Sequence, residues 1–201
     1  SGGVRFIFDI SAEEKTKFSL KLSDILRSKD RIIPGDFIYM TDIMYNPEII
    51  NKAGLILASA FNNQKIDYIV TVETKGVPLA NAVANVLNVP FVIVRRDLKI
   101  TEGSTVSVNY VSGSSDRIEK MFLSKRSLKA GSRVLIVDDF LKNGGTINGM
   151  ISLLSEFDST LVGVAVFAEN QKGDRSVANY KSLLAVTDIN VKENRVDVEL
   201  G

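Results

Sequence analysis

The hydrophobic positions along the chain predict an open α/β sheet. Val, Ile and Leu form continuous runs, without polar alternation, in four segments: 66–72, 89–96, 133–139 and 160–170. Runs of this kind predict strands that are covered on both faces, as in a parallel sheet. Helical segments alternate with them at 46–64, 76–88 and 145–157. Because strands and helices alternate, we expect right-handed crossover connections.

Helix start signals add detail towards the N-terminus. A predicted helix at 11–29 begins at Ser11, which forms a capping box with Glu14. The helix at 46–64 begins with Asn46 as its cap and a proline in its first turn. Strand-like segments towards the two ends of the chain are 4–10, 181–191 and 195–200.

Residues 36–43 are rich in strand-forming residues. Strand periodicity would place Phe37, Tyr39 and Thr41 on one face. A nucleobase could stack on an aromatic ring there, although core packing is the simpler role for at least one of the two rings.

Residues 99–128 interrupt the α/β pattern with a segment rich in Ser, Thr and Gly. Apolar and polar residues alternate on either side of 112–115, which predicts an antiparallel hairpin with a flexible tip. The hairpin would project from the core. It is either an ordinary surface hairpin or a mobile flap over a site.

Composition limits the chemistry that the chain can perform. Its 201 residues suffice for one sizeable core, and its net charge of +1 gives no reason to expect nucleic-acid binding through bulk charge. Cys and His are both absent, which excludes disulfides, thiol nucleophiles, imidazole bases and Cys or His metal sites. Any metal would be an oxygen-preferring ion such as Mg²⁺. No apolar run is long enough to span a membrane.

The stretch VLIVDDFLKNGGTINGM carries the clearest chemical signal. Asp138 and Asp139 follow a buried strand, and the carboxyl edge of an open α/β sheet is where ligands bind. Carboxylates accept hydrogen bonds and suit a diol. Lys142 supplies a positive charge, while the Gly-Gly-Thr turn and the following helix start offer amides to an anion. These properties together match a ribose 5-phosphate; the alternative is a polar turn with a helix cap.

DDFLKNGGTINGM also resembles the ribose-phosphate signature of type I phosphoribosyltransferases. Lys142 and Asn143 stand where most transferases have small residues, and Phe140 stands where they have Val or Leu. With TEGSTVSVNYVSGSSDRI and ETKGVPLA, the stretch resembles the effector domain of the purine operon repressors of Gram-positive bacteria. The resemblance covers essentially the whole chain. It implies a type I phosphoribosyltransferase-like fold: an open, mainly parallel sheet flanked by helices, with the hairpin projecting.

The resemblance implies that 1–201 is a single effector domain that binds phosphoribosyl pyrophosphate (PRPP), with Mg²⁺ as a compatible companion ion. In that family a winged-helix domain precedes this one and contacts operator DNA; we expect it to be absent here. The family likeness also implies a homodimer in the cytoplasm, with no membrane partner. Purine nucleotides such as guanosine polyphosphates are expected to compete at the PRPP site.

The resemblance extends the site to two further loops. It implies that backbone amides of Thr74 to Gly76, together with the Lys75 side chain, face pyrophosphate. Arg95 and Arg96 end another strand, and Arg suits phosphate because its fork is bidentate. Consecutive strand residues point to opposite faces, so only one of the two is expected to enter the site. The expected ligand-binding residues are Tyr39, Thr74, Lys75, Gly76, Arg95, Arg96, Asp138, Asp139, Phe140, Leu141, Lys142, Asn143, Gly144, Gly145 and Thr146.

Three functions remain open from the sequence. The first is a regulatory domain without catalytic residues that senses PRPP for a repressor of purine biosynthesis. The second is an active purine phosphoribosyltransferase for xanthine or guanine. The third, a dimerisation platform with a dead site, is disfavoured because both Asp138 and Asp139 are present. No convincing base-reading pocket can be recognised in AVFAENQKGD, residues 165–174.

Overall fold

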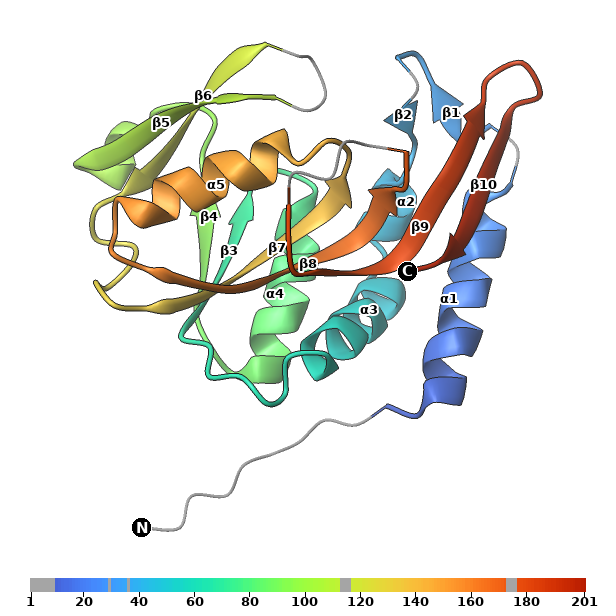
Figure 1. Cartoon of the computed structure of the whole chain (residues 1–201), viewed down its shortest axis with the longest axis horizontal. Helices are drawn as coiled ribbons and strands as arrows, with labels where there is room; N and C mark the ends of the chain where they lie inside the picture. The colour runs from blue at the N-terminus through green and yellow to red at the C-terminus, as the bar shows by residue number, and fades with distance from the viewer. Residues whose placement is uncertain (1–9, 29, 36, 113–116, 173–176) are drawn as a thin grey trace.

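The computed structural model describes residues 10–28, 30–35, 37–112, 117–172 and 177–201. A six-stranded sheet in the order β10-β9-β8-β7-β3-β4 forms the centre of the chain (Figure 1). All neighbouring pairs in it are parallel except β9 and β10, which confirms the predicted open, mainly parallel sheet. Its strands are β3 (Tyr68–Val72), β4 (Phe91–Val94), β7 (Arg133–Leu141), β8 (Thr160–Asn170), β9 (Tyr180–Asn190) and β10 (Arg195–Leu200).

Helices cover both faces of this sheet (Figure 1). Helices α1, α3 and α4 lie on one face, and α5 lies on the other. Along β7, Leu135 and Val137 belong to the core cluster under α3 and α4, while Val134 and Ile136 belong to the cluster under α5. This burial on both sides is the reason for the continuous apolar run. The helices are α1 (Ala12–Leu26), α2 (Thr41–Met44), α3 (Pro47–Ser59), α4 (Gly76–Leu87) and α5 (Gly145–Ser155), with a 3₁₀ turn η1 (Ile100–Glu102).

Both predicted N-terminal caps are present. The Ser11 side chain accepts the Glu14 N–H at the start of α1. The Asn46 side chain accepts the N–H groups of Glu48 and Ile49 at the start of α3. Each cap satisfies donors that have no partner inside the helix. None of the helices in the described part of the chain is long and apolar enough to cross a membrane.

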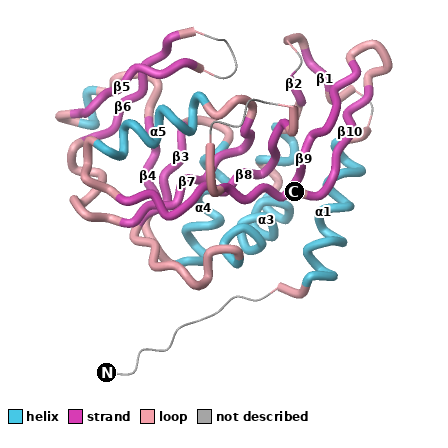
Figure 2. The backbone as a smooth tube through the Cα atoms, in the orientation of Figure 1, coloured by secondary structure: helices cyan, strands magenta, loops and turns pink. Residues whose placement is uncertain are grey.

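The predicted hairpin is formed by β5 (Thr105–Val111) and β6 (Ile118–Ser124), paired antiparallel (Figure 2). It lies over α5, where a Cβ on Gly149 would come within 2.8 Å of Tyr110 and Met121 side-chain atoms. The hairpin therefore rests directly on the helix backbone. Of the predicted flexible tip, 113–115 lie outside the described residues, as do 4–9 of the strand predicted at 4–10.

The strand predicted at 36–43 is wrong for most of its length. Only a short antiparallel pair forms there, β1 (Ile32–Ile33) with β2 (Phe37–Ile38). The chain then turns into α2, where the Met40 carbonyl accepts the N–H groups of Ile43 and Met44. Phe37, Tyr39 and Thr41 consequently do not share a strand face.

Candidate functional site

A cavity of about 600 Å³ opens at the carboxyl edge of the central sheet. The ends of β3, β7 and β8 contribute Val72, Asp138 and Asn170 to its lining. The β1–β2 pair contributes Ile33, Phe37 and Ile38, and β9 contributes Ile189. The cavity thus combines a polar floor with an apolar wall, as small-molecule sites commonly do.

The acidic pair lies within β7 rather than after it. Asp138 pairs in register with Val166 of β8, and the strand continues to Leu141. Asp138 is only 4% exposed, and its Oδ1 accepts the Asp139 N–H at 2.9 Å. Burial, followed by the charge of Asp139, raises the pKa of Asp138 well above its usual range. Both carboxylates line the cavity.

Gly76 lets the start of α4 approach this acidic pair. A Cβ at position 76 would come within 2.6 Å of Thr71 Oγ1 and 2.8 Å of Asp138 Oδ1. Contacts that short do not occur without displacement of the neighbouring atoms. Gly76 therefore contributes space beside Asp138, although its own atoms do not line the cavity.

The glycine turn between β7 and α5 forms the next part of the lining. Gly144 has φ +78°, in the left-handed region that favours glycine, and α5 begins at Gly145. Gly145, Thr146 and Ile147 all line the cavity, so the N-terminal end of α5 faces it. That end carries free amide donors and the positive end of the helix dipole, which suits a phosphate.

Lys142, in the turn between β7 and α5, reaches the β1–β2 pair. Its Nζ is 4.9 Å from the centre of the Phe37 ring, within range of a cation–π interaction. This contact joins the glycine turn to a wall that is remote in sequence.

A third group of residues comes from the loop after β3. Glu73, Thr74 and Lys75 line the cavity. Burial opposes ionisation of Glu73, but hydrogen bonds from the Arg96 N–H at 2.6 Å and from the Arg95 guanidinium at 3.3 Å outweigh it and hold its pKa below the usual value. The loop is thereby fastened to the end of β4.

The structure brings most of the expected residues around this one cavity. All nine residues from Asp138 to Thr146 line it, together with Thr74, Lys75 and Arg96. Arg95 does not; it pairs instead with Glu73 and Glu102. Tyr39 is also absent from the lining, since the strand that would have carried it inwards ends at Ile38.

Several lining residues were missed by sequence reasoning. Asn170 lies in the segment where no base pocket was recognised, yet it ends β8 at the same sheet edge as Asp138. The rule that pointed to Asp138 would also have pointed to Asn170. The other missed residues are Ile33, Ile38, Met40, Val72, Glu73, Asp97, Ile147 and Ile189. Phe37, one of the two rings considered for base stacking, does line the cavity.

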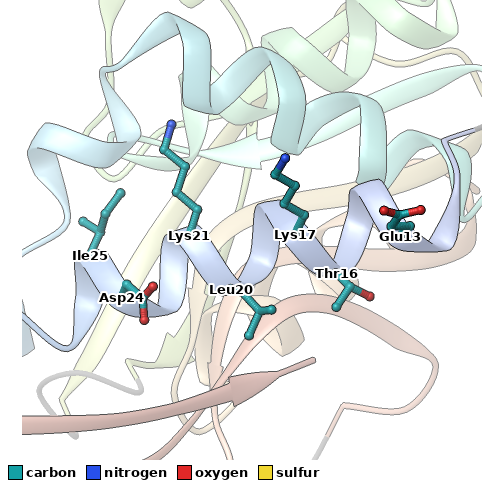
Figure 3. A pocket seen from close by; sticks show the side chains of 7 residues that line it. All are labelled: Glu13, Thr16, Lys17, Leu20, Lys21, Asp24 and Ile25. Atoms are coloured by element: carbon teal, nitrogen blue, oxygen red, sulfur yellow. The ribbon is translucent and has the colours of Figure 1, made fainter.

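The rest of the described structure offers no comparable site. Within the described residues no group of three or more acidic side chains is placed to hold a metal ion. A second hollow lies along α1, lined by Thr16, Leu20 and Lys21 among others (Figure 3). All of its lining residues belong to that single helix, so no second element converges on a ligand there.

Comparison with known proteins defines the class first. The model of the phosphoribosyl transferase domain matches residues 40–200. An adenine phosphoribosyltransferase from Rhodothermus marinus has the same fold, with a TM-score of 0.73, 23% identity, and coverage of 85% of this chain and 99% of that one. The fold and the cavity edge thus belong to a phosphoribosyltransferase-type domain.

Closer relatives are regulators. A probable purine biosynthesis transcriptional regulator PurR of Streptococcus pneumoniae is 66% identical over 100% of this chain and 74% of its own length. The transcriptional activator PurR of Lactococcus lactis is 51% identical, and the transcriptional repressor PurR of Bacillus subtilis is 50% identical, again over 100% of this chain. The chain therefore belongs to the PurR family of purine biosynthesis regulators.

Proposed function

We propose that this domain binds PRPP in the cytoplasm, and that this binding controls how the regulator acts at the operators of purine biosynthesis genes. The observation that carries the proposal is the convergence on one cavity of the Asp138–Asp139 pair, the glycine turn at 142–146 and the loop at 73–75. The carboxylates suit the ribose hydroxyls, the amides at the start of α5 suit the 5-phosphate, and Lys75 with Arg96 suits pyrophosphate.

Purine nucleotides are proposed to compete for the same cavity. The apolar wall of Ile33, Ile38 and Ile189 offers a surface for a purine ring, and Asn170 offers an amide near it. A guanosine polyphosphate could then place its phosphates on the loops that PRPP uses. Mg²⁺ accompanying PRPP would find hard oxygen ligands in Asp138 and Asp139.

A regulator is favoured over a transferase by two observations. The relatives that match the whole chain are named as regulators. In addition, the turn that would hold the 5-phosphate carries the bulky Lys142, whose ammonium group contacts the Phe37 ring of β2. One of these relatives is named an activator and another a repressor. We propose repression, because the sequence resembles the purine operon repressors. Expression of a reporter gene under the cognate operator measures the direction of control. DNA contact through a further domain, and a homodimer, remain predictions for footprinting and sedimentation.

Calorimetric titration with PRPP and Mg²⁺ tests the proposal. We expect saturable binding to the wild type, competition by guanine nucleotides, and loss of binding in Asp138→Ala and Asp139→Ala with the fold retained by circular dichroism. Incubation with PRPP and purine bases is expected to form no nucleotide at enzyme-like rates. Unchanged PRPP affinity in both variants would contradict the site, and rapid nucleotide formation would establish a transferase instead.

A further inference from the structure

Arg96 connects the cavity to two other parts of the chain, the loop after β3 and the β5–β6 hairpin. Its backbone N–H donates to Glu73 Oε1 at 2.6 Å, and its Nε donates to the Glu73 carbonyl at 3.3 Å. Arg96 also lines the cavity. At the same time its NH1 donates to Glu119 Oε2 at 3.0 Å, across to the β5–β6 hairpin. The cation beside the cavity is therefore already engaged by a carboxylate that is not part of the cavity.

Glu119 belongs to the hairpin and lies outside the cavity lining. It faces Tyr110 across the two strands, and the Tyr110 hydroxyl donates to the same oxygen, Oε2, at 2.7 Å. Burial and this hydrogen bond raise the pKa of Tyr110 to about 12, so the hydroxyl stays a donor. Tyr110 also packs against Gly149 of α5. The hairpin thus holds Glu119 at a fixed position beside Arg96.

A ligand phosphate and the Glu119 carboxylate would compete for the single positive charge of the Arg96 guanidinium. Arg96 has its backbone fixed by Glu73, but its side chain is 41% exposed and that of Glu119 is 31% exposed, so the pair can separate without burying a lone charge. An ion pair this exposed is weak, so a ligand phosphate can displace it. Charge-assisted bonds to phosphate are stronger, and they favour transfer of Arg96 to the ligand.

We infer that Glu119 is a positioning residue that sets the affinity for pyrophosphate-bearing ligands, and that occupancy of the cavity draws Arg96 away from Glu119. The hairpin itself stays attached to the end of β4, because Arg95 and Phe122 exchange backbone hydrogen bonds at 2.9 and 2.8 Å. The inference rests on the proposed function, because it takes PRPP as the ligand. It adds a residue outside the cavity that competes with the ligand for Arg96.

The test is titration of the Glu119→Gln variant with PRPP and, separately, with ribose 5-phosphate. Loss of the competing charge is expected to tighten PRPP binding roughly two- to fivefold. Ribose 5-phosphate, which lacks pyrophosphate, is expected to bind as it does to the wild type. Damage to the fold weakens binding rather than tightening it, so a gain confined to PRPP separates competition from a structural role. Glu119→Asp, which withdraws the charge by one methylene, is expected to give a smaller gain.

Glu102→Gln is the matched control, because Glu102 pairs with Arg95, which does not line the cavity. Its PRPP affinity should equal that of the wild type. If PRPP binds the wild type while Glu119→Gln shows the same affinity, the inference fails and the proposed function stands. If PRPP binds neither protein, both fail.

Discussion

Asp138 is a residue that folding alone would not select. It is 4% exposed and lies beside a second carboxylate. Because its folded-state pKa is raised, the contribution of Asp138 to the stability of the unliganded protein is fully present below the ordinary pKa of Asp and is lost as the pH rises through its folded-state pKa. The presence of this carboxylate is therefore better explained by a ligand than by folding.

Asp138→Asn is accordingly expected to stabilise the unliganded protein at pH 7, by about 1 kcal/mol, because it removes a buried charge and keeps an acceptor for the Asp139 N–H. Urea unfolding at a series of pH values measures this. The gain should shrink as the pH falls and Asp138 becomes protonated in the wild type. Asp139→Asn serves as the neighbouring control. A less stable Asp138→Asn at pH 7 would mean that the charge has a structural role.

At the scale of the element, the start of α3 depends on one side chain. Asn46 accepts two N–H groups that the helix cannot satisfy internally. Asn46→Ala is expected to lower the free energy of unfolding by about 1 kcal/mol, whereas Asn46→Asp should retain the cap. Chemical denaturation of the three proteins tests this, and equal losses in both variants would show that the cap is not the cause.

The β1–β2 wall of the cavity is held in place by the side chain of Arg31. Arg31 donates from both guanidinium ends to Asp42, at 2.7 and 2.9 Å, and also to the Tyr39 carbonyl. The hydrogen bond from Arg31, partly offset by burial, lowers the pKa of Asp42. The stability from this pair is thus present above the ordinary pKa of Asp and is lost as the pH falls through the lowered pKa.

Asp42→Asn is expected to weaken binding of purine nucleotides severalfold while ribose 5-phosphate is unaffected, because the apolar wall shifts and the glycine turn does not. The carboxylate is 47% exposed, so the loss of stability should be only about 0.5–1 kcal/mol at neutral pH and should vanish in acid. Glu48→Gln, which breaks an exposed pair with Lys21, is the matched control. Parallel titrations of the three proteins decide the matter.

The sequence predicted elements well where burial shapes the pattern. The helix expected at 76–88 is Gly76–Leu87, and the strand expected at 160–170 is Thr160–Asn170. The strand expected at 36–43 failed because no Gly or Pro marks the turn at Met40, and β-branched residues fit a short helix when its carbonyls are satisfied locally. Which of the two consecutive residues, Arg95 or Arg96, lines the cavity could be decided only from the three-dimensional course of the backbone after β4.

At the scale of the whole molecule, the site could be predicted only in part. Residues that follow one another, from Asp138 to Thr146, were recognisable because their chemistry is contiguous. The contact of Lys142 with Phe37 and the pair of Arg96 with Glu119 join distant segments, and their geometry follows from packing that no local pattern encodes.

Ligand binding should be visible in the stability of the whole chain. A ligand that binds only the folded state at a concentration 100 times its Kd adds about 2.7 kcal/mol to the free energy of unfolding. For a chain of this size that is expected to raise the Tm by roughly 5–10 °C. Thermal scans over a PRPP series should show the shift growing with the logarithm of concentration, and Asp138→Ala should show none. A shift that is equal in that variant would place binding elsewhere.

The extension of β7 through the acidic pair has a mechanical consequence. Asp138 and Phe140 are tied by ladder pairing to Val166 and Ala168, so their backbone cannot yield without opening the middle of the sheet. The side of the cavity formed by β7 is therefore rigid. Any displacement of the backbone on ligand binding must occur in parts of the lining that lie outside the hydrogen-bonded ladder of the sheet.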